Sequence, residues 1–289
     1  MSNEKPRYRD AYFTVRDGLR LHYRDYPGSA DRPPLLCLPG LTRNARDFAG
    51  LAERLSPQYR VLALDFRGRA ASDHDPQPGR YNPLTYAGDV VELLNQQMVD
   101  RAIFVGTSLG GLVTMTVAGL APQRIAAAIL NDIGPELHQA GLDRIKSYVG
   151  KDIRFADWDD AARTIAKNVG NIPERYTQED WVRMARRTCR EDNGAIVFDY
   201  DFAIAHPFNT GDPAPKFDMW PLFHALAQHP VLVVRGERSD LLSAEAAEQM
   251  RRAAPTVRIA VVPGVGHAPE LDEPEAVAAI DAFLGEIAP

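Results

Sequence analysis

Hydrophobic and polar positions alternate near the start of the chain and then settle into a repeating order of strands and helices. Residues 12–15 and 19–25 alternate around Asp17-Gly18, a dipeptide typical of tight hairpin turns. Beyond residue 34, short apolar runs typical of buried strands alternate with segments whose hydrophobic residues recur with the period of a helix. The predicted strands of this part are residues 35–38, 60–66, 102–105, 125–130, 230–235 and 257–262, and the predicted helices are residues 45–55, 84–98, 111–120, 220–227, 244–253 and 274–286.

This order predicts an α/β fold with a mostly parallel sheet of eight strands and helices on both faces. The opening hairpin would add antiparallel edge strands. Between residues 135 and 215 the order breaks, and this more charged stretch suggests several amphipathic helices without a convincing series of strands. We therefore predict an α/β core formed by residues 1–134 and 216–289, interrupted by a helical cap over residues 135–215.

Composition narrows the class of protein. The chain has 289 residues, of which 45% are hydrophobic and 25% charged, as in an ordinary globular protein. Its net charge of −6 argues against nucleic acid or an anionic membrane as the main partner. Two cysteines exclude a disulfide framework, and no signal-peptide core or membrane-length apolar run occurs. We expect a cytoplasmic protein that acts on a small molecule, as a monomer or a homodimer.

The stretch Gly106-Thr107-Ser108-Leu109-Gly110 carries the strongest chemical signal. It follows a predicted strand and leads into a predicted helix. A Gly-x-Ser-x-Gly sequence in that setting predicts a turn so tight that the serine is strained and its hydroxyl faces a cleft. Ser108 is therefore the candidate nucleophile.

A serine hydroxyl needs a base to take its proton as it attacks. Of the seven histidines, His267 lies directly after the last predicted strand. Gly264 and Gly266 would let its loop bend over the carboxyl ends of the strands, where open α/β sheets hold their active sites. We predict that His267 is the base.

The imidazolium formed during attack needs a carboxylate to orient and stabilise it. Asp240 lies just beyond the strand predicted at residues 230–235, and Asp132 lies at the end of the strand predicted at residues 125–130. Glu237 is a weaker alternative. We favour Asp240, because a nucleophile followed by an acid and then a histidine is the chain order of this architecture.

A tetrahedral intermediate would also need two amide donors for its oxyanion. The N–H of Leu109 is one candidate because it begins the helix after the serine. The N–H of Leu41, in the loop over residues 38–42, is the other. No Gly-x-Gly-x-x-Gly, phosphate loop or clustered metal-ligand pattern occurs, so no cofactor and no metal ion is expected.

Five stretches resemble the α/β-hydrolase superfamily, and together they span nearly the whole chain. They are Leu38-Pro39-Gly40-Leu41, Asp65-Phe66-Arg67-Gly68, Gly106-Thr107-Ser108-Leu109-Gly110-Gly111, Arg235-Gly236-Glu237-Arg238-Ser239-Asp240 and Gly264-Val265-Gly266-His267-Ala268-Pro269-Glu270. The resemblance implies the α/β-hydrolase fold and a serine, a histidine and an aspartate acting together. Pro39 replaces a histidine that is frequent in the family, and residues 69–72 lack a further glycine, a change we interpret as structural.

We accordingly expect a serine hydrolase that cleaves a small carboxylic ester, lactone or thioester through an acyl-enzyme. A C–C bond hydrolase, an enol-lactonase, an acyltransferase, a perhydrolase and a non-catalytic ligand receptor remain alternatives on the same fold. The cap should set specificity. Aromatic residues there that could line an apolar wall are Trp158, Trp181, Phe198, Tyr200, Phe202, Phe208 and Trp220.

Overall fold

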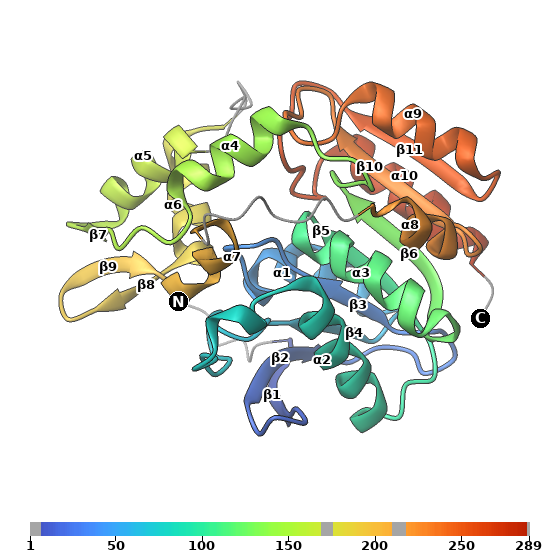
Figure 1. Cartoon of the computed structure of the whole chain (residues 1–289), viewed down its shortest axis with the longest axis horizontal. Helices are drawn as coiled ribbons and strands as arrows, with labels where there is room; N and C mark the ends of the chain where they lie inside the picture. Colours follow the sequence, from blue (N-terminus) through green and yellow to red (C-terminus); the bar gives the residue numbers. More distant parts are fainter. Residues whose placement is uncertain (1–6, 169–175, 210–217, 288–289) are drawn as a thin grey trace.

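The main sheet has the strand arrangement that the hydrophobic pattern predicts. A computed structural model describes residues 7–168, 176–209 and 218–287. Within them the largest sheet has eight strands in the order β1-β2-β4-β3-β5-β6-β10-β11 (Figure 1). The β1–β2 and β2–β4 pairs are antiparallel and the other pairs are parallel. The strands are β1 (Arg9–Thr14), β2 (Arg20–Tyr26), β3 (Leu35–Leu38), β4 (Val61–Leu64), β5 (Ala102–Thr107), β6 (Ile125–Asn131), β10 (Val231–Gly236) and β11 (Val257–Val262).

Helices cover both faces of this sheet because alternate residues of each buried strand point to opposite sides. In β3, for example, Leu36 and Leu38 belong to one apolar cluster and Leu35 and Cys37 to the other. Helices α2, α3, α8 and α9 contribute to the first cluster, and α1 and α10 contribute to the second. Their bounds are α1 (Ala49–Leu55), α2 (Pro83–Gln96), α3 (Leu109–Leu120), α8 (Trp220–Leu226), α9 (Ala244–Ala253) and α10 (Pro274–Glu286). None of the helices in the described residues is long and apolar enough to cross a bilayer.

The segment that interrupts the core contains strands as well as helices. Figure 1 shows this cap segment (residues 135–168 and 176–209), coloured from green to yellow, grouped on one side of the main sheet. Its helices are α4 (Gln139–Tyr148), α5 (Trp158–Asn168), α6 (Gln178–Thr188) and α7 (His206–Asn209), and its strands are β7 (Arg154–Phe155), β8 (Cys189–Asp192) and β9 (Ala195–Phe198).

The three strands of the cap segment form a separate antiparallel sheet in the order β7-β9-β8. The expectation of helices alone was therefore incomplete. Strands of two to four residues are too short to show a hydrophobic period. The predicted cap boundary at residue 215 lies outside the described residues.

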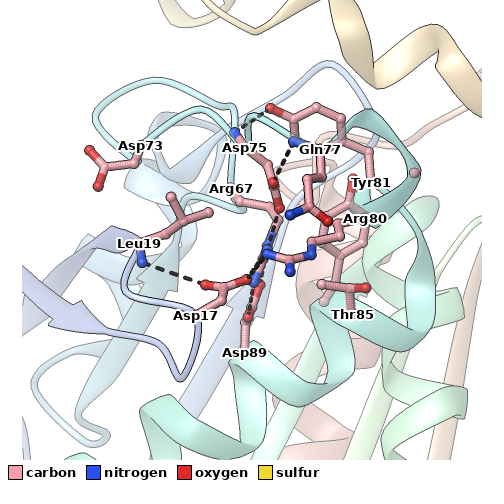
Figure 2. A network of polar contacts seen from close by, with 12 residues as sticks. Asp17, Leu19, Arg67, Asp73, Asp75, Gln77, Arg80, Tyr81, Thr85 and Asp89 are labelled. Carbon is pink, nitrogen blue, oxygen red and sulfur yellow. Dashed lines mark hydrogen bonds and ion pairs between the residues drawn. The ribbon is translucent and has the colours of Figure 1, made fainter.

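A buried arginine holds the loop that follows β4. Arg67 is 2% exposed and donates hydrogen bonds to Asp89 on α2 at 2.8 and 2.5 Å (Figure 2). It also donates to Asp75 at 2.5 Å and to Asp17 in the β1–β2 turn at 2.8 Å. A buried charge is tolerated only when it is paired and hydrogen-bonded. The network therefore joins the hairpin, the loop after β4 and α2 into one support.

The same loop contacts the cap segment. Ala70 has a φ of 45°, a left-handed conformation that glycine adopts at no steric cost. Its N–H donates to the carbonyl of Asp199 at 3.0 Å, and the N–H of Asp201 donates to the carbonyl of Gly68 at 2.7 Å. The missing glycine of residues 69–72 thus falls where the core meets the cap segment.

Candidate active site

Ser108 stands at a sharp turn between β5 and α3. Its φ of 51° and ψ of −114° put a non-glycine residue in a strained conformation. A Cβ atom on Gly106 would lie 2.5 Å from the carbonyl oxygen of Gly110, and one on Gly110 would lie 2.0 Å from that of Leu38. Both contacts are impossible for a larger residue, which explains why glycine flanks the serine on both sides.

His267 reaches Ser108 from the loop after β11. Its Nε2 lies 2.9 Å from Ser108 Oγ. To arrive there, the loop passes over the end of β10, where a Cβ on Gly236 would lie 2.4 Å from the carbonyl oxygen of Gly266. The absence of a side chain at Gly236 therefore lets the histidine approach the serine.

The carboxylate that contacts His267 belongs to Asp132, whose Oδ2 lies 2.8 Å from His267 Nδ1. Asp132 is 0% exposed and also accepts from the N–H of Gly236 at 2.9 Å and from the hydroxyl of Ser239 at 2.5 Å. This corrects the prediction from the sequence, which assigned the contact to Asp240.

Sheet order explains the correction. Strands β5 and β6 are parallel neighbours, with Thr107 aligned to Asn131. Ser108 and Asp132 are the next residues along, so they leave adjacent strand ends side by side. The order Ser108, Asp132, His267 is also nucleophile, acid, histidine, so chain order could not discriminate between the two aspartates.

Asp240 has a different partner. It lies four residues past the end of β10, and its carboxylate accepts from Arg144 of α4 at 2.6 and 2.8 Å. Burial alone would raise the pKa of Asp240, but the hydrogen bonds and charge of Arg144 outweigh it and lower that pKa below its ordinary value. The Glu237 carboxylate accepts from the N–H of Gly264 at 2.7 Å and shapes the loop before His267. Through its hydrogen bonds with Arg144, Asp240 joins the loop after β10 to α4 of the cap segment.

The two residues expected to supply oxyanion donors are Leu109, which follows Ser108 in the chain, and Leu41. Leu109 is the first residue of α3, so its amide has no acceptor within the helix. Leu41 lines the same cavity as Ser108, and its carbonyl accepts from Arg69 Nε at 3.0 Å. Because Arg69 is fully buried, this bond holds the loop in position. Both amides stay predictions as oxyanion donors.

Ser108 and His267 open into a cavity of about 150 Å³ between the core and the cap segment. Its mainly apolar wall comes from Leu41, Phe48, Ile145, Tyr148, Ile165, Met184, Phe198 and Leu271. Of the seven cap aromatics proposed from the sequence, Phe198 alone lines this cavity among the described residues. Tyr148 and Phe48 were missed, because the sequence cannot tell a pocket aromatic from a core one.

Charged side chains line the cavity too, namely Arg43, Asp47, Arg144, Arg187 and Glu270. In the part of the chain that the structure describes, no group of three or more His, Cys, Asp or Glu side chains is placed to hold a metal ion.

A sequence model described as the alpha/beta hydrolase family matches residues 35–280. The chain belongs to this family. The hydrolase is similar to a 3-hydroxybutyrate-oligomer hydrolase of Cupriavidus necator, with 33% identity over 92% of each chain. It is also similar to a 2-(acetamidomethylene)succinate hydrolase of Mesorhizobium japonicum, with 30% identity over 81% of each chain.

A solved structure agrees with this family membership. The crystal structure of an alpha/beta hydrolase from Novosphingobium aromaticivorans has 49% sequence identity to this hydrolase and a TM-score of 0.92, covering 98% of this chain and 99% of the other. Family, relatives and fold together show that the protein is a hydrolase enzyme.

Proposed function

We propose that this hydrolase cleaves a small carboxylic ester, lactone or thioester through an acyl-enzyme on Ser108. The observation that supports the proposal most is the hydrogen-bonded chain from Ser108 Oγ through His267 to Asp132, with distances of 2.9 and 2.8 Å. A nucleophile, a base and a group that orients the base are the parts that acyl transfer needs. Relatives named as hydrolases add support at the level of reaction class.

The proposed reaction has two halves. His267 Nε2 takes the proton of Ser108 as Oγ attacks the carbonyl carbon, and the amides of Leu41 and Leu109 donate to the oxyanion. Asp132 holds His267 Nδ1–H and steadies the imidazolium. His267 then gives its proton to the leaving oxygen or sulfur as the acyl bond breaks.

The second half returns the enzyme to its starting state. His267 takes a proton from water, whose oxygen attacks the acyl carbon, and Ser108 leaves with the proton that His267 carries. The acid is released. Turnover thus consumes only the substrate and one water molecule.

The test compares wild type with Ser108→Ala, using a fluorophosphonate probe and aryl esters of graded acyl length. We expect Ser108→Ala to lose labelling and at least about 10³-fold in kcat/KM, because no other group replaces the nucleophile. The small cavity should favour short acyl groups. An unchanged thermal unfolding midpoint would show that the variant is folded, and turnover near the wild-type rate would overturn the mechanism.

Hydrolysis and acyl transfer share this first half, so a second measurement is needed. Product analysis with water, an alcohol and hydrogen peroxide as competing acceptors separates them. We expect the free acid as the main product. Predominant formation of a new ester or a peracid would indicate an acyltransferase or a perhydrolase.

A further inference from the structure

The wall of the cavity carries more positive than negative side chains although the whole chain has a net charge of −6. Arg43, Arg144 and Arg187 line it, whereas Asp47 and Glu270 are the acidic lining residues. The partner of Arg144, Asp240, is not among the described residues that form the wall. Because Arg144 is bound to Asp240 by two hydrogen bonds, this pair adds no net charge to the site, and Arg43 and Arg187 are likewise balanced by Asp47 and Glu270. Attraction for an anionic ligand must therefore come from guanidinium donors that these carboxylates leave unused.

Two of these arginines keep donors that their partners do not use. Arg43 gives Nε and Nη2 to Asp47 at 2.6 and 2.7 Å. Arg187 gives only Nη2 to the two oxygens of Glu270, at 2.7 and 2.8 Å. A guanidinium has five N–H donors, and two of them together match the two oxygens of a carboxylate. Arg43 and Arg187 can therefore each bind a second carboxylate.

The Nε of Arg187 has a specific need for an acceptor. It is buried and has no hydrogen-bond partner among the described residues, since Asp47 Oδ1 is 4.0 Å away. A buried donor without an acceptor costs free energy, and an anion bound to the Arg187 guanidinium would recover that cost if the side chain turned to bring Nε to it.

Both arginines line the same cavity as Ser108 and His267. If Gly40 carried a Cβ atom, Arg43 Cγ would be 3.4 Å from it and Ser108 Cβ 3.7 Å. Arg187, on α6, is bound to Glu270, which follows His267 by three residues. A carboxylate held between Arg43 and Arg187 would therefore lie in the same cavity as a carbonyl at Ser108.

We propose that the substrate of this hydrolase carries a carboxylate, and that Arg43 and Arg187 bind it. The inference rests on the proposed function, because it concerns the selectivity of the reaction at Ser108. The expected substrates are short-chain esters or thioesters that carry a carboxylate.

A simpler explanation is that these ion pairs only fasten the cap segment to the core. Arg187 and Glu270 do join α6 to the loop of His267, as Arg144 and Asp240 join α4 to the loop after β10. Such a fastening would affect neutral and anionic substrates alike. Fastening alone would also give no role to the unused donors of Arg43 and Arg187. The effect of substrate charge on kcat/KM therefore distinguishes the two explanations.

The experiment measures kcat/KM for matched anionic and neutral esters. One pair, monophenyl glutarate and phenyl butyrate, places the carboxylate on the acyl side. The other pair, the acetate esters of 4-hydroxybutyrate and 4-hydroxybutyramide, places it on the alcohol side. We expect wild type to prefer the anionic ester at least tenfold in one of the two pairs, with a preference that falls as salt is added.

The decisive variant removes an arginine together with its carboxylate, because an unpaired Glu270 would itself repel an anion. Arg187→Gln with Glu270→Gln should lower the anionic-to-neutral ratio at least tenfold while neutral turnover changes less. Arg144→Gln with Asp240→Asn is the matched control, since it removes a similar pair between cap segment and core. We expect the control to leave the ratio within about threefold of wild type.

The failures of the two proposals are distinguishable. If turnover depends on Ser108 but wild type shows no anionic preference in either pair, the carboxylate inference is overturned and the serine mechanism stands. A preference that survives in the Arg187 variant, or that disappears in the Arg144 control alone, overturns the assignment to Arg43 and Arg187. Turnover that does not depend on Ser108 overturns the proposed function itself.

Discussion

Asp132 receives three hydrogen bonds at once, from His267 Nδ1, the N–H of Gly236 and the hydroxyl of Ser239. A fully buried carboxylate is costly unless its oxygens are satisfied in this way. The three donors also leave the side chain little freedom to turn. Asp132 can therefore fix the orientation of the His267 ring as well as balance the charge that forms on it.

Replacement of Asp132 should test this role. In Asp132→Asn the side chain keeps its shape but loses the acceptor that selects the His267 tautomer, so we expect kcat/KM on an aryl ester to fall by about 10²- to 10⁴-fold. Asp240→Asn removes only a partner of Arg144, and we expect a loss of less than about tenfold. Steady-state kinetics on both variants checks the prediction. Activity lost in Asp240→Asn and kept in Asp132→Asn would return the role to Asp240.

At the scale of elements, the loop after β4 is held by one buried arginine that contacts three carboxylates. Figure 2 shows Arg67 between Asp17, Asp75 and Asp89, which come from the hairpin, the loop itself and α2. The same loop supplies Arg69, which donates to the carbonyl of Leu41, a residue that lines the cavity at Ser108. The support of the loop and the shape of the site are therefore linked.

Removal of this cation should destabilise the protein strongly. We expect Arg67→Met to lower the free energy of unfolding by about 3–5 kcal/mol, because it leaves buried carboxylates without a counter-charge. Arg80→Met is the matched control. Arg80 binds the same Asp17 at 3.0 Å, but its side chain is 38% exposed against 2% for Arg67, so its loss should cost about 0–1 kcal/mol. Urea unfolding of the two variants makes the comparison, and equal losses would mean that burial of Arg67 is not the cause.

At the scale of the whole molecule, two histidines make stability depend on pH in opposite directions. His22 in β2 lies between Asp65 at 2.6 Å and Asp10 at 2.9 Å. Burial on its own lowers the pKa of His22, but the hydrogen bonds and charges of the two aspartates outweigh it and raise that pKa above 6.5. No carboxylate of the described residues plays this part at His229, and burial lowers its pKa below 6.5.

The sign of each effect follows from proton linkage. A raised pKa in the folded state stabilises fully below pH 6.5, and the stabilisation is lost as pH rises through the folded-state pKa. The difference in free energy of unfolding between wild type and His22→Gln should therefore shrink as pH is raised above 6.5. For His229→Gln the difference should instead shrink as pH falls below 6.5. Urea unfolding between pH 5 and 9 measures both, and a pH-independent difference for His22→Gln would show that its charge does not contribute.

Most of the core could be predicted because its signals are local. The bounds expected for Leu35–Leu38, Ala244–Ala253, Val257–Val262 and Pro274–Glu286 agree with the structure, since each depends on neighbouring residues and turn chemistry alone. Ser108 was predicted to be the nucleophile in the same way, from five consecutive residues between a strand and a helix, and the structure places it at the turn between β5 and α3. The small sheet of the cap segment was not predicted, because its short strands show no hydrophobic pattern of their own and are stabilised by pairing with one another.

Which of Asp132 and Asp240 contacts His267 could not be predicted from such local signals. Both follow a strand, and both stand between serine and histidine in the chain. What separates them is that β6 lies next to β5 in the sheet, and that the loop of His267 crosses the end of β10. That Arg43, Arg144 and Arg187 line one cavity could not be predicted for the same reason. They come together because the cap segment packs against the core. The hydrophobic pattern thus determines which elements form, through interactions within a few residues. Contacts between elements decide which side chains share a site, because those contacts join residues that are far apart in the chain.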